Sequence, residues 1–211
     1  MKPNIDYTLY LVTDRALMTA GSMEACVEQA ILGGCTVVQL REKTASSHAF
    51  FQTAVRVREV TARLGVPLII NDRADIALSV DADGLHIGQN DLPYEAARRI
   101  VGHDKIVGVS AHNLEQARRA AEMGADYIGV GAMFATGTKT DANPTSIDEL
   151  RRIRRELNIP IVAIGGINKN NVSHLKDIGV NGIAVVSAIV AEQDMVGAAQ
   201  ELKALFQGEH L

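Results

Sequence analysis

The sequence is poor in the residues that build disulfide-stabilised or zinc-binding domains. It contains two cysteines, Cys26 and Cys35, which neither form a CxxC pair nor neighbour an evident general base, so we expect small buried hydrophobic residues and no structural disulfide. The six histidines are scattered, without an HExxH motif or a Cys/His cluster, and a zinc site is therefore not expected. His86 is expected to be a hydrogen-bonded barrel residue rather than a metal ligand.

Long apolar runs and an excess of cations are also absent. No segment reaches the roughly 18 apolar residues of a membrane-spanning helix, and residues 1–6 lack the apolar core of a signal peptide, which predicts a cytoplasmic protein with no membrane partner. The formal net charge of −4 argues against a nucleic-acid partner. Because no linker or low-complexity stretch interrupts residues 1–211, we predict one domain, and the oligomeric state, monomer or homo-oligomer, stays open.

What the sequence does contain is a repeated alternation of strand and helix patterns. Most segments between the apolar runs carry helical periodicity, and several end in glycine, the usual left-handed helix stop. Dividing 211 residues by eight runs gives about 26 per unit, enough for one strand, one helix and two loops. We therefore predict an α/β fold, a single-domain (β/α)8 TIM barrel, with an open doubly wound sheet as the alternative. The predicted strands are Thr8 to Val12, Thr36 to Leu40, Leu68 to Ile70, Leu85 to Ile87, Ile106 to Val109, Tyr127 to Val130, Ile161 to Ile164 and Ile183 to Val186.

The second predicted strand ends in a charged pentapeptide, Gln39-Leu40-Arg41-Glu42-Lys43. Turns favour Gly, Asn, Pro or Ser, so two cations, an anion and an amide at this point indicate chemistry rather than chain reversal. Arg41 offers a planar fork of donors for phosphate oxygens and Lys43 offers a mobile positive charge, a pair that suits a diphosphate. The alternative is a solvated strand end with an Arg-Glu pair.

Carboxylates follow the next two strands. Asp72 comes after Asn71 at the end of the third strand, and Asp91 follows the fourth. The carboxyl ends of barrel strands converge, and Mg²⁺ is commonly held by one or two carboxylates, waters and substrate phosphates, so these two aspartates are the predicted metal ligands. Alternatively, Asp72 caps the helix that begins near Ala74, and Asp91 caps the helix that begins near Pro93.

A second anion site is predicted at the seventh and eighth strands. Gly165-Gly166 and Val186-Ser187 follow these strands, at positions where many barrels bind a phosphate through backbone amides. A tight turn would also need the glycines. The polar loop from Ala135 to Pro144 lies between the two sites. Either its Lys139 reaches a phosphate, or the loop is solvated and mobile.

Seven motifs, in order along nearly the whole chain, resemble those of the thiamine phosphate synthase family, whose members are small (β/α)8 enzymes. One stretch departs from the family, because Ala132 and Ala135 stand where it usually has prolines, and this leaves the rigidity of the sixth loop open. The motifs are Gln39-Leu40-Arg41-Glu42-Lys43, Asn71-Asp72, His86-Ile87-Gly88-Gln89 with Asp91, Gly108-Val109-Ser110-Ala111-His112, Thr136-Gly137-Thr138-Lys139, Ile164-Gly165-Gly166-Ile167 and Val185-Val186-Ser187-Ala188-Ile189.

The resemblance implies a reaction, a cofactor and site residues. An aminopyrimidine diphosphate and a thiazole phosphate would be joined to thiamine monophosphate with loss of diphosphate, assisted by Mg²⁺ on Asp72 and Asp91. The alternatives are the family's paralogue, a thiazole tautomerase once read as a regulatory protein, which would not need the pentapeptide together with both aspartates, and a non-catalytic phosphate-binding module. The implied ligands of the pyrimidine diphosphate are Gln39, Leu40, Arg41, Glu42, Lys43, Asn71, Ser110 and Lys139, with Arg41, Lys43, Ser110 and Lys139 in catalysis, and those of the thiazole phosphate are Thr136, Gly137, Thr138, Gly166, Val186 and Ser187.

Overall fold

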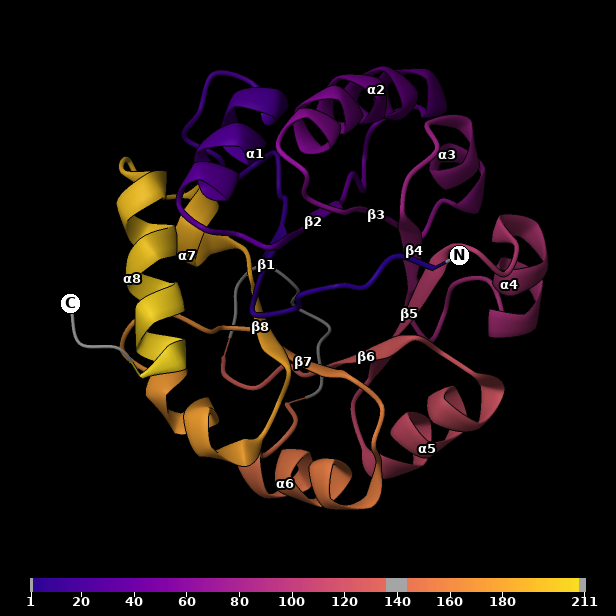
Figure 1. Cartoon of the computed structure of the whole chain (residues 1–211), viewed down its shortest axis with the longest axis vertical. Coiled ribbons are helices and arrows are strands. Elements are labelled where there is room, and N and C mark those ends of the chain that lie inside the picture. The colour runs from indigo at the N-terminus through magenta and orange to yellow at the C-terminus, as the bar shows by residue number, and fades with distance from the viewer. Residues whose placement is uncertain (1, 136–143, 209–211) are drawn as a thin grey trace.

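A computed structural model describes residues 2–135 and 144–208. Its strands form a closed parallel barrel in which each strand pairs with the next along the chain and β8 pairs with β1. Figure 1 looks down this barrel, with the strands in the centre and the helices in a ring around them. The closure confirms the predicted (β/α)8 barrel and rules out the open doubly wound sheet. The strands are β1 (Leu9–Val12), β2 (Val37–Leu40), β3 (Leu68–Asn71), β4 (Gly84–Ile87), β5 (Ile106–Ala111), β6 (Tyr127–Val130), β7 (Ile161–Ile164) and β8 (Gly182–Val185).

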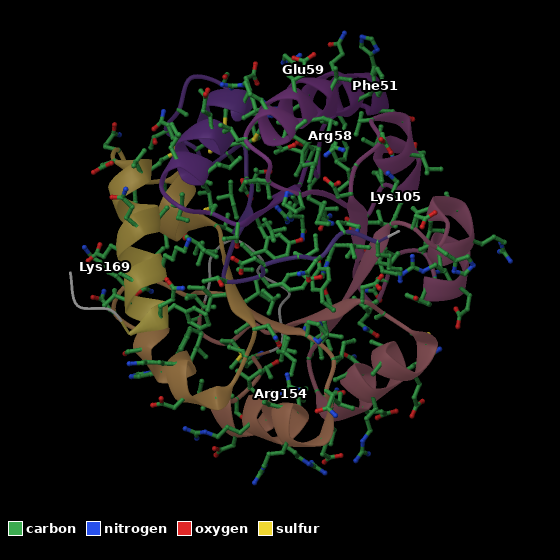
Figure 2. The ribbon with its side chains drawn as sticks, in the orientation of Figure 1. Phe51, Arg58, Glu59, Lys105, Arg154 and Lys169 are labelled. Atoms are coloured by element: carbon green, nitrogen blue, oxygen red, sulfur yellow. The ribbon has the colours of Figure 1, made fainter. Side chains whose placement is uncertain are left out.

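The helices cover the outside of the barrel. Figure 2 shows Phe51 and Glu59 of α2 pointing away from the barrel, while other side chains fill the space between the ribbons. Among the helices of the described residues, none has both the length and the apolar surface to cross a membrane. The segment between β7 and β8 forms a 3₁₀ helix instead of the α-helix usual in such a barrel. The helices are α1 (Met23–Leu32), α2 (Ser47–Arg63), α3 (Ala74–Ser79), α4 (Tyr94–Val101), α5 (Leu114–Met123), α6 (Ile147–Glu156), the 3₁₀ helix η1 (Val172–Ile178), α7 (Ser187–Val190) and α8 (Met195–Gln207).

The strands divide the apolar side chains into two layers. In β1, Leu9 and Leu11 belong to the large cluster between the sheet and the helices, whereas Tyr10 and Val12 belong to a smaller cluster inside the barrel. This alternation follows from the two-residue period of a β-strand, and it explains why both faces of each strand are apolar in a barrel. The inner cluster also contains Tyr7 and Tyr127, so three tyrosines lie in the barrel interior.

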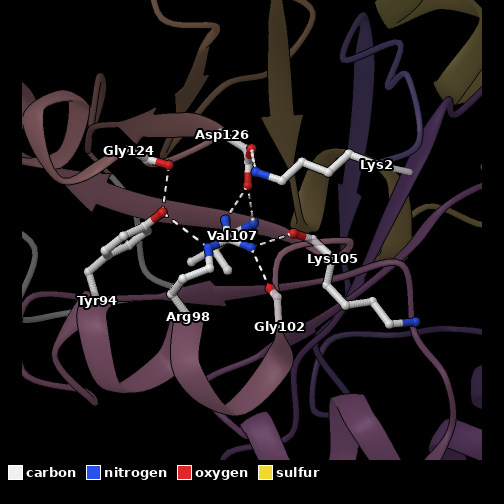
Figure 3. A network of polar contacts seen from close by, with 8 residues as sticks. All are labelled: Lys2, Tyr94, Arg98, Gly102, Lys105, Val107, Gly124 and Asp126. Carbon is white, nitrogen blue, oxygen red and sulfur yellow. Dashed lines mark hydrogen bonds and ion pairs between the residues drawn. The ribbon is translucent and has the colours of Figure 1, made fainter.

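The amino-terminal end of the barrel is closed by a polar network around Arg98. This buried side chain, at the end of α4, donates to Asp126 at 2.5 Å and to the backbone oxygen of Gly102 at 2.9 Å (Figure 3). Asp126 also accepts from the backbone N–H of Val107 at 2.8 Å and pairs with Lys2 at 2.5 Å. The segment before β1 is thereby tied to the start of β5 and β6, on the opposite side from the carboxyl ends of the strands.

Candidate active site

A cavity opens at the carboxyl ends of the strands, where the barrel fold leads one to expect a site. It collects side chains from strands that are far apart in the sequence, including most of the predicted site residues. Four predicted residues, Thr136, Gly137, Thr138 and Lys139, lie outside the described residues. The predicted residues that line the cavity are Gln39, Arg41, Lys43, Asn71, Asp72, Asp91, Ser110, Gly166, Val186 and Ser187.

The pentapeptide at the end of β2 presents only alternate side chains to this cavity. Gln39, Arg41 and Lys43 line it, whereas Leu40 is fully buried in the layer beneath the helices. The Glu42 carboxylate points away from the lining and accepts from Arg15 at 2.5 Å. The resemblance implies Leu40 and Glu42 among the ligands of the pyrimidine diphosphate. The structure places both side chains outside the cavity, because neighbouring residues of an extended chain face opposite ways.

Arg41 is held by a partner that the sequence analysis did not single out. Its guanidinium donates to Asp14 Oδ2 at 3.0 Å, and both side chains are mostly buried. Its backbone N–H donates to Thr13 Oγ1 at 3.0 Å. The Arg-Glu pair of the alternative interpretation is therefore not formed within the pentapeptide, because Arg41 pairs with Asp14 and Glu42 pairs with Arg15. The signal that could have found Asp14 is its position just after the first strand, at the same end of the barrel as the other site residues.

The two predicted metal ligands lie together, with a cation beside them. Lys43 Nζ is 2.5 Å from Asp72 Oδ2, and the neighbouring Asp91 accepts from the backbone N–H of Gly88 at 2.7 Å. Desolvation raises the pKa of Asp91, and the adjacent Asp72 carboxyl raises it further. Two carboxyls in contact with one site favour a bound proton or a bound cation.

The helix-cap interpretation of these aspartates is wrong. The cap position of α3 is Arg73 and that of α4 is Pro93, and neither makes a side-chain capping bond. Asp72 instead adopts a left-handed backbone conformation with φ of 62°, an uncommon state for any residue but glycine. Such a conformation at the cavity is consistent with a functional demand on the position of the carboxylate.

The described residues contain no cluster of three or more His, Cys, Asp and Glu side chains that could hold a metal by themselves. The pair of Asp72 and Asp91 is therefore an incomplete ligand set. Mg²⁺ fits this arrangement, because it usually keeps several waters and takes its remaining ligands from substrate phosphates.

The inner wall of the cavity is polar and was largely missed by the sequence analysis. Tyr10 and Tyr127 line the cavity and are hydrogen-bonded to one another, with their hydroxyl oxygens 2.8 Å apart. His86 lies 2.8 Å from the Tyr127 hydroxyl and 2.9 Å from Ser110 Oγ, which confirms that it is a hydrogen-bonded barrel residue. Ser110 is further held by Gln89, whose side-chain nitrogen donates to the Ser110 backbone oxygen at 2.6 Å.

The glycine pair after β7 allows a close approach of the chain that follows β6. Gly165 and Gly166 both have positive φ, 101° and 67°. The backbone N–H of Phe134 donates to the oxygen of Gly165 at 3.0 Å, and a Cβ on Gly166 would lie 2.5 Å from the oxygen of Ala135. The tight-turn interpretation is therefore confirmed, and the same turn lines the cavity together with Val186 and Ser187. The missing prolines do not prevent residues 133 and 134 from being tied to the end of β7.

Comparison with known proteins gives consistent matches over the whole chain. Residues 9–189 match the family described as thiamine monophosphate synthase. The chain is 58% identical to the thiamine-phosphate synthase of Clostridium beijerinckii over 96% of this chain and 97% of the relative, and 58% identical to that of Ruminiclostridium cellulolyticum over 98% of each. Among solved structures, a thiamine phosphate pyrophosphorylase from Pyrococcus furiosus superposes with a TM-score of 0.89 at 37% identity, covering 96% of both chains.

Proposed function

Because the chain belongs to the thiamine monophosphate synthase family, we propose that it joins 4-amino-2-methyl-5-(diphosphooxymethyl)pyrimidine to 4-methyl-5-(2-phosphooxyethyl)thiazole, giving thiamine monophosphate and diphosphate. The protein is a transferase of thiamine biosynthesis that acts on small phosphorylated substrates. The observation that carries the proposal is the composition of the cavity at the carboxyl ends of the strands. Cations and carboxylates gather at β2 to β4, and the glycine turn and Ser187 lie at β7 and β8, so one cavity offers two separate places for phosphate groups.

The diphosphate of the pyrimidine substrate is assigned to the first of these places. Arg41 is oriented by Asp14 and offers its remaining donors to phosphate oxygens, and Lys43 adds a positive charge next to Asp72. Asn71 and Ser110 line the same part of the cavity. Lys139, which lies outside the described residues, is assigned to the same group by the family resemblance. The role of these residues is to stabilise the charge of the leaving diphosphate.

Asp72 and Asp91 are the residues that would hold Mg²⁺ beside the diphosphate. Their fit rests on the donor set, two neighbouring carboxyls that line the same cavity. Desolvation and the adjacent Asp72 raise the pKa of Asp91, which is the direction expected where a cation would be welcome. A bound Mg²⁺ would supply Lewis-acid stabilisation of the diphosphate. The protein's own part is to fix the carboxylates, one through the left-handed backbone of Asp72 and the other through the N–H of Gly88.

The thiazole phosphate is assigned to the turn after β7 and the segment after β8. Gly166, Val186 and Ser187 line that end of the cavity, and backbone N–H groups in such turns are suited to anions. Thr136, Gly137 and Thr138 are assigned to the same phosphate by the family resemblance. This arrangement would leave the two rings facing each other between the two phosphate sites, which is the positioning that a bond-forming reaction needs.

Bond breaking is proposed to precede bond formation. The amino group donates electrons toward the methylene carbon of the pyrimidine, so the carbon–oxygen bond can break first, with the diphosphate held as an ion-pair partner until the thiazole nitrogen attacks. Exchanging the ring methyl for trifluoromethyl withdraws electrons and should slow single-turnover catalysis by orders of magnitude, each tenfold loss corresponding to about 1.4 kcal/mol. An unchanged rate would support direct displacement instead.

The experiment that tests the function is release of diphosphate in the presence of both substrates and Mg²⁺. Synthase activity requires both substrates, so omission of either should abolish the signal. A tautomerase would act on a thiazole alone without releasing diphosphate, and a binding module would retain ligands without turnover. The cytoplasmic location, the absence of nucleic-acid and membrane partners and the choice between monomer and homo-oligomer stay predictions.

A further inference from the structure

A chain of hydrogen bonds crosses the barrel interior along the wall of the cavity. Gln39 Nε2 donates to Tyr10 Oη at 2.9 Å, and Tyr10 Oη lies 2.8 Å from Tyr127 Oη. His86 continues the chain, with Nδ1 2.8 Å from Tyr127 Oη and Nε2 2.9 Å from Ser110 Oγ. The chain thus joins two cavity-lining residues, Gln39 of β2 and Ser110 of β5, through three residues contributed by β1, β6 and β4.

The Gln39 donor at one end of the chain assigns a direction to the other hydrogen bonds. Burial raises the pKa of Tyr10 and of Tyr127, so each phenol stays protonated and has one hydrogen to donate. Because Tyr10 accepts from the Gln39 amide nitrogen, its own hydrogen is directed to Tyr127, and that of Tyr127 is directed to His86 Nδ1. His86 then carries its hydrogen on Nε2 and donates it to Ser110 Oγ.

Both ends of the chain are open to a ligand. Within residues 2–135 and 144–208 the Ser110 hydroxyl is hydrogen-bonded only to His86, which donates to it, and the side-chain oxygen of Gln39 makes no hydrogen bond. In that same part of the protein no fully buried side-chain oxygen lacks a partner, so the Gln39 oxygen is accessible from the cavity that this residue lines. The cavity therefore presents a fixed acceptor on β2 and a fixed donor on β5.

Two glycines in the neighbouring strands make room for the chain. Glycine weakens a strand and often marks a place where another group approaches closely. A Cβ on Gly108 of β5 would lie 2.1 Å from Tyr127 Cζ, and a Cβ on Gly129 of β6 would lie 3.2 Å from His86 Cε1. The two rings occupy the space that these strands leave open, so packing holds each ring in contact with both of its hydrogen-bond partners.

We propose that Tyr10, Tyr127 and His86 are positioning residues that set the hydrogen-bond polarity of the pyrimidine pocket. The inference rests on the proposed function: the Gln39 oxygen accepts from the exocyclic amino group of the pyrimidine, and the Ser110 hydroxyl donates to an acceptor of the same substrate. A pyrimidine with an oxo group in place of the amino group would place its oxo oxygen, an acceptor, against the Gln39 oxygen, which is also an acceptor. Such a ring is rejected, because a site built to bond a donor discriminates strongly against a ligand without it.

The matched variants that test this are Tyr127→Phe and Tyr7→Phe. Both remove one hydroxyl from the inner layer, and the two rings lie together with centroids 4.9 Å apart, yet only Tyr127 belongs to the chain. Calorimetry should compare the 4-amino and 4-oxo pyrimidine diphosphates. We expect wild-type protein and Tyr7→Phe to prefer the amino ring by at least about tenfold, a difference of about 1.4 kcal/mol. Tyr127→Phe should lose most of this preference, and an unchanged preference would overturn the proposal.

Nitrogen-15 NMR of the ligand-free protein tests the chain without any substrate. We expect the Nε2–H tautomer of His86 in wild-type protein and in Tyr7→Phe, and a mixture of ring forms in Tyr127→Phe, with the signals assigned by their loss in His86→Gln. An Nδ1–H tautomer in the wild type, or an unchanged ring in Tyr127→Phe, would contradict the direction of the chain. If the ring behaves as expected and neither pyrimidine diphosphate binds, the chain stands and the proposed function fails.

Discussion

The surroundings of Asp91 disfavour the charged form of its carboxyl group. Desolvation and the neighbouring Asp72 raise the pKa of Asp91. Because the folded-state pKa lies above the unfolded value, stability is greatest below the unfolded pKa and is lost as the pH rises through the folded pKa. Asp91→Asn removes the ionisable group and with it this loss of stability, while its amide oxygen can still accept from the Gly88 N–H. We therefore expect the Tm without Mg²⁺ to rise at neutral pH. The rise should be about 1–2 °C, the size of one weak charge interaction. At pH 3 the two proteins should melt alike.

Asp75, in the first turn of α3, offers a control of opposite sign. The hydrogen bond from Arg73 lowers the pKa of Asp75, so the stability that Asp75 contributes is present above its unfolded pKa and is lost as the pH falls. Asp75→Asn should therefore lower the Tm at neutral pH and not at pH 3, measured by calorimetry. An equal response of both variants would show that charge removal, and not the local environment, decides the Tm.

The gain in stability at Asp91 should come with a loss of activity. Asp91→Asn and Asp72→Asn are each expected to reduce kcat by about 100-fold, the loss seen when one charge-stabilising group is removed from a transition state. Addition of EDTA to the wild type should have a similar effect, measured as diphosphate release. Full activity of the double variant would show that neither residue is needed as a metal ligand.

The single residues of the site could be predicted only in part from the sequence. Arg41 and Lys43 were found because charges at a strand end are unusual, and the structure places both on the cavity. Tyr10 and Tyr127 were missed because an inward-facing tyrosine is indistinguishable from a core residue in the sequence. Asp14 was missed because the choice of ion-pair partner depends on the reach of side chains across neighbouring strands, which no local pattern records.

At the scale of elements, the turn after β7 is expected to govern binding of the thiazole phosphate. Gly166 has φ of 67°, and a Cβ there would lie 2.5 Å from the oxygen of Ala135. Gly166→Ala should therefore displace the chain after β6 and raise KM for the thiazole phosphate about tenfold. The expected kcat changes little, because the phosphate is bound similarly in the ground and transition states. Steady-state kinetics with saturating pyrimidine diphosphate measures this.

Gly65→Ala separates the steric effect from backbone strain. Gly65 has nearly the same φ, 69°, but a Cβ there meets no atom within 4 Å. Both substitutions place alanine in the left-handed region at about 1–2 kcal/mol each, and only Gly166→Ala should change KM. A rise in KM for Gly65→Ala as well would indicate that loss of stability alone explains the kinetics.

The sequence predicts which segments are strands and helices. The features that it predicts wrongly, such as partners of side chains at helix ends, depend on tertiary contacts. All eight predicted strands are present, because parallel barrel strands are continuous apolar runs. Ser146 to Glu149 have the sequence of a capping box, and Ser146 does cap α6, accepting from the backbone N–H of Glu149 at 3.1 Å. The Glu149 side chain, however, accepts from the backbone N–H of Leu114 at 2.7 Å and so links α6 to α5. α3 also departs from the helices that end in a left-handed glycine, because the left-handed residue after it is Asp81.

At the scale of the whole molecule, the barrel separates stability from chemistry. The cavity residues lie at the carboxyl ends of the strands, and the Arg98 network lies at their amino-terminal ends. In barrels of this kind the first end carries activity and the second carries stability. Substitutions at the two ends should therefore change different measured quantities, and Arg98 offers the sharper test because its guanidinium is buried and fully engaged.

Arg98→Ala removes the buried one of the two cations, Arg98 and Lys2, that lie 2.5 Å from the Asp126 carboxylate. It also removes hydrogen bonds to the backbone oxygens of Gly102 and Lys105. Breaking a buried pair by removing one partner costs about 3 kcal/mol, which corresponds to a fall in Tm of about 6–12 °C for a chain of this size. The exposed pair of Arg63 and Glu28 is the control, and Arg63→Ala should change the Tm by less than about 2 °C. At a temperature where both variants are folded, kcat for diphosphate release should equal that of the wild type. A loss of kcat in Arg98→Ala without a fall in Tm would show that the amino-terminal end of the barrel also acts on the chemistry.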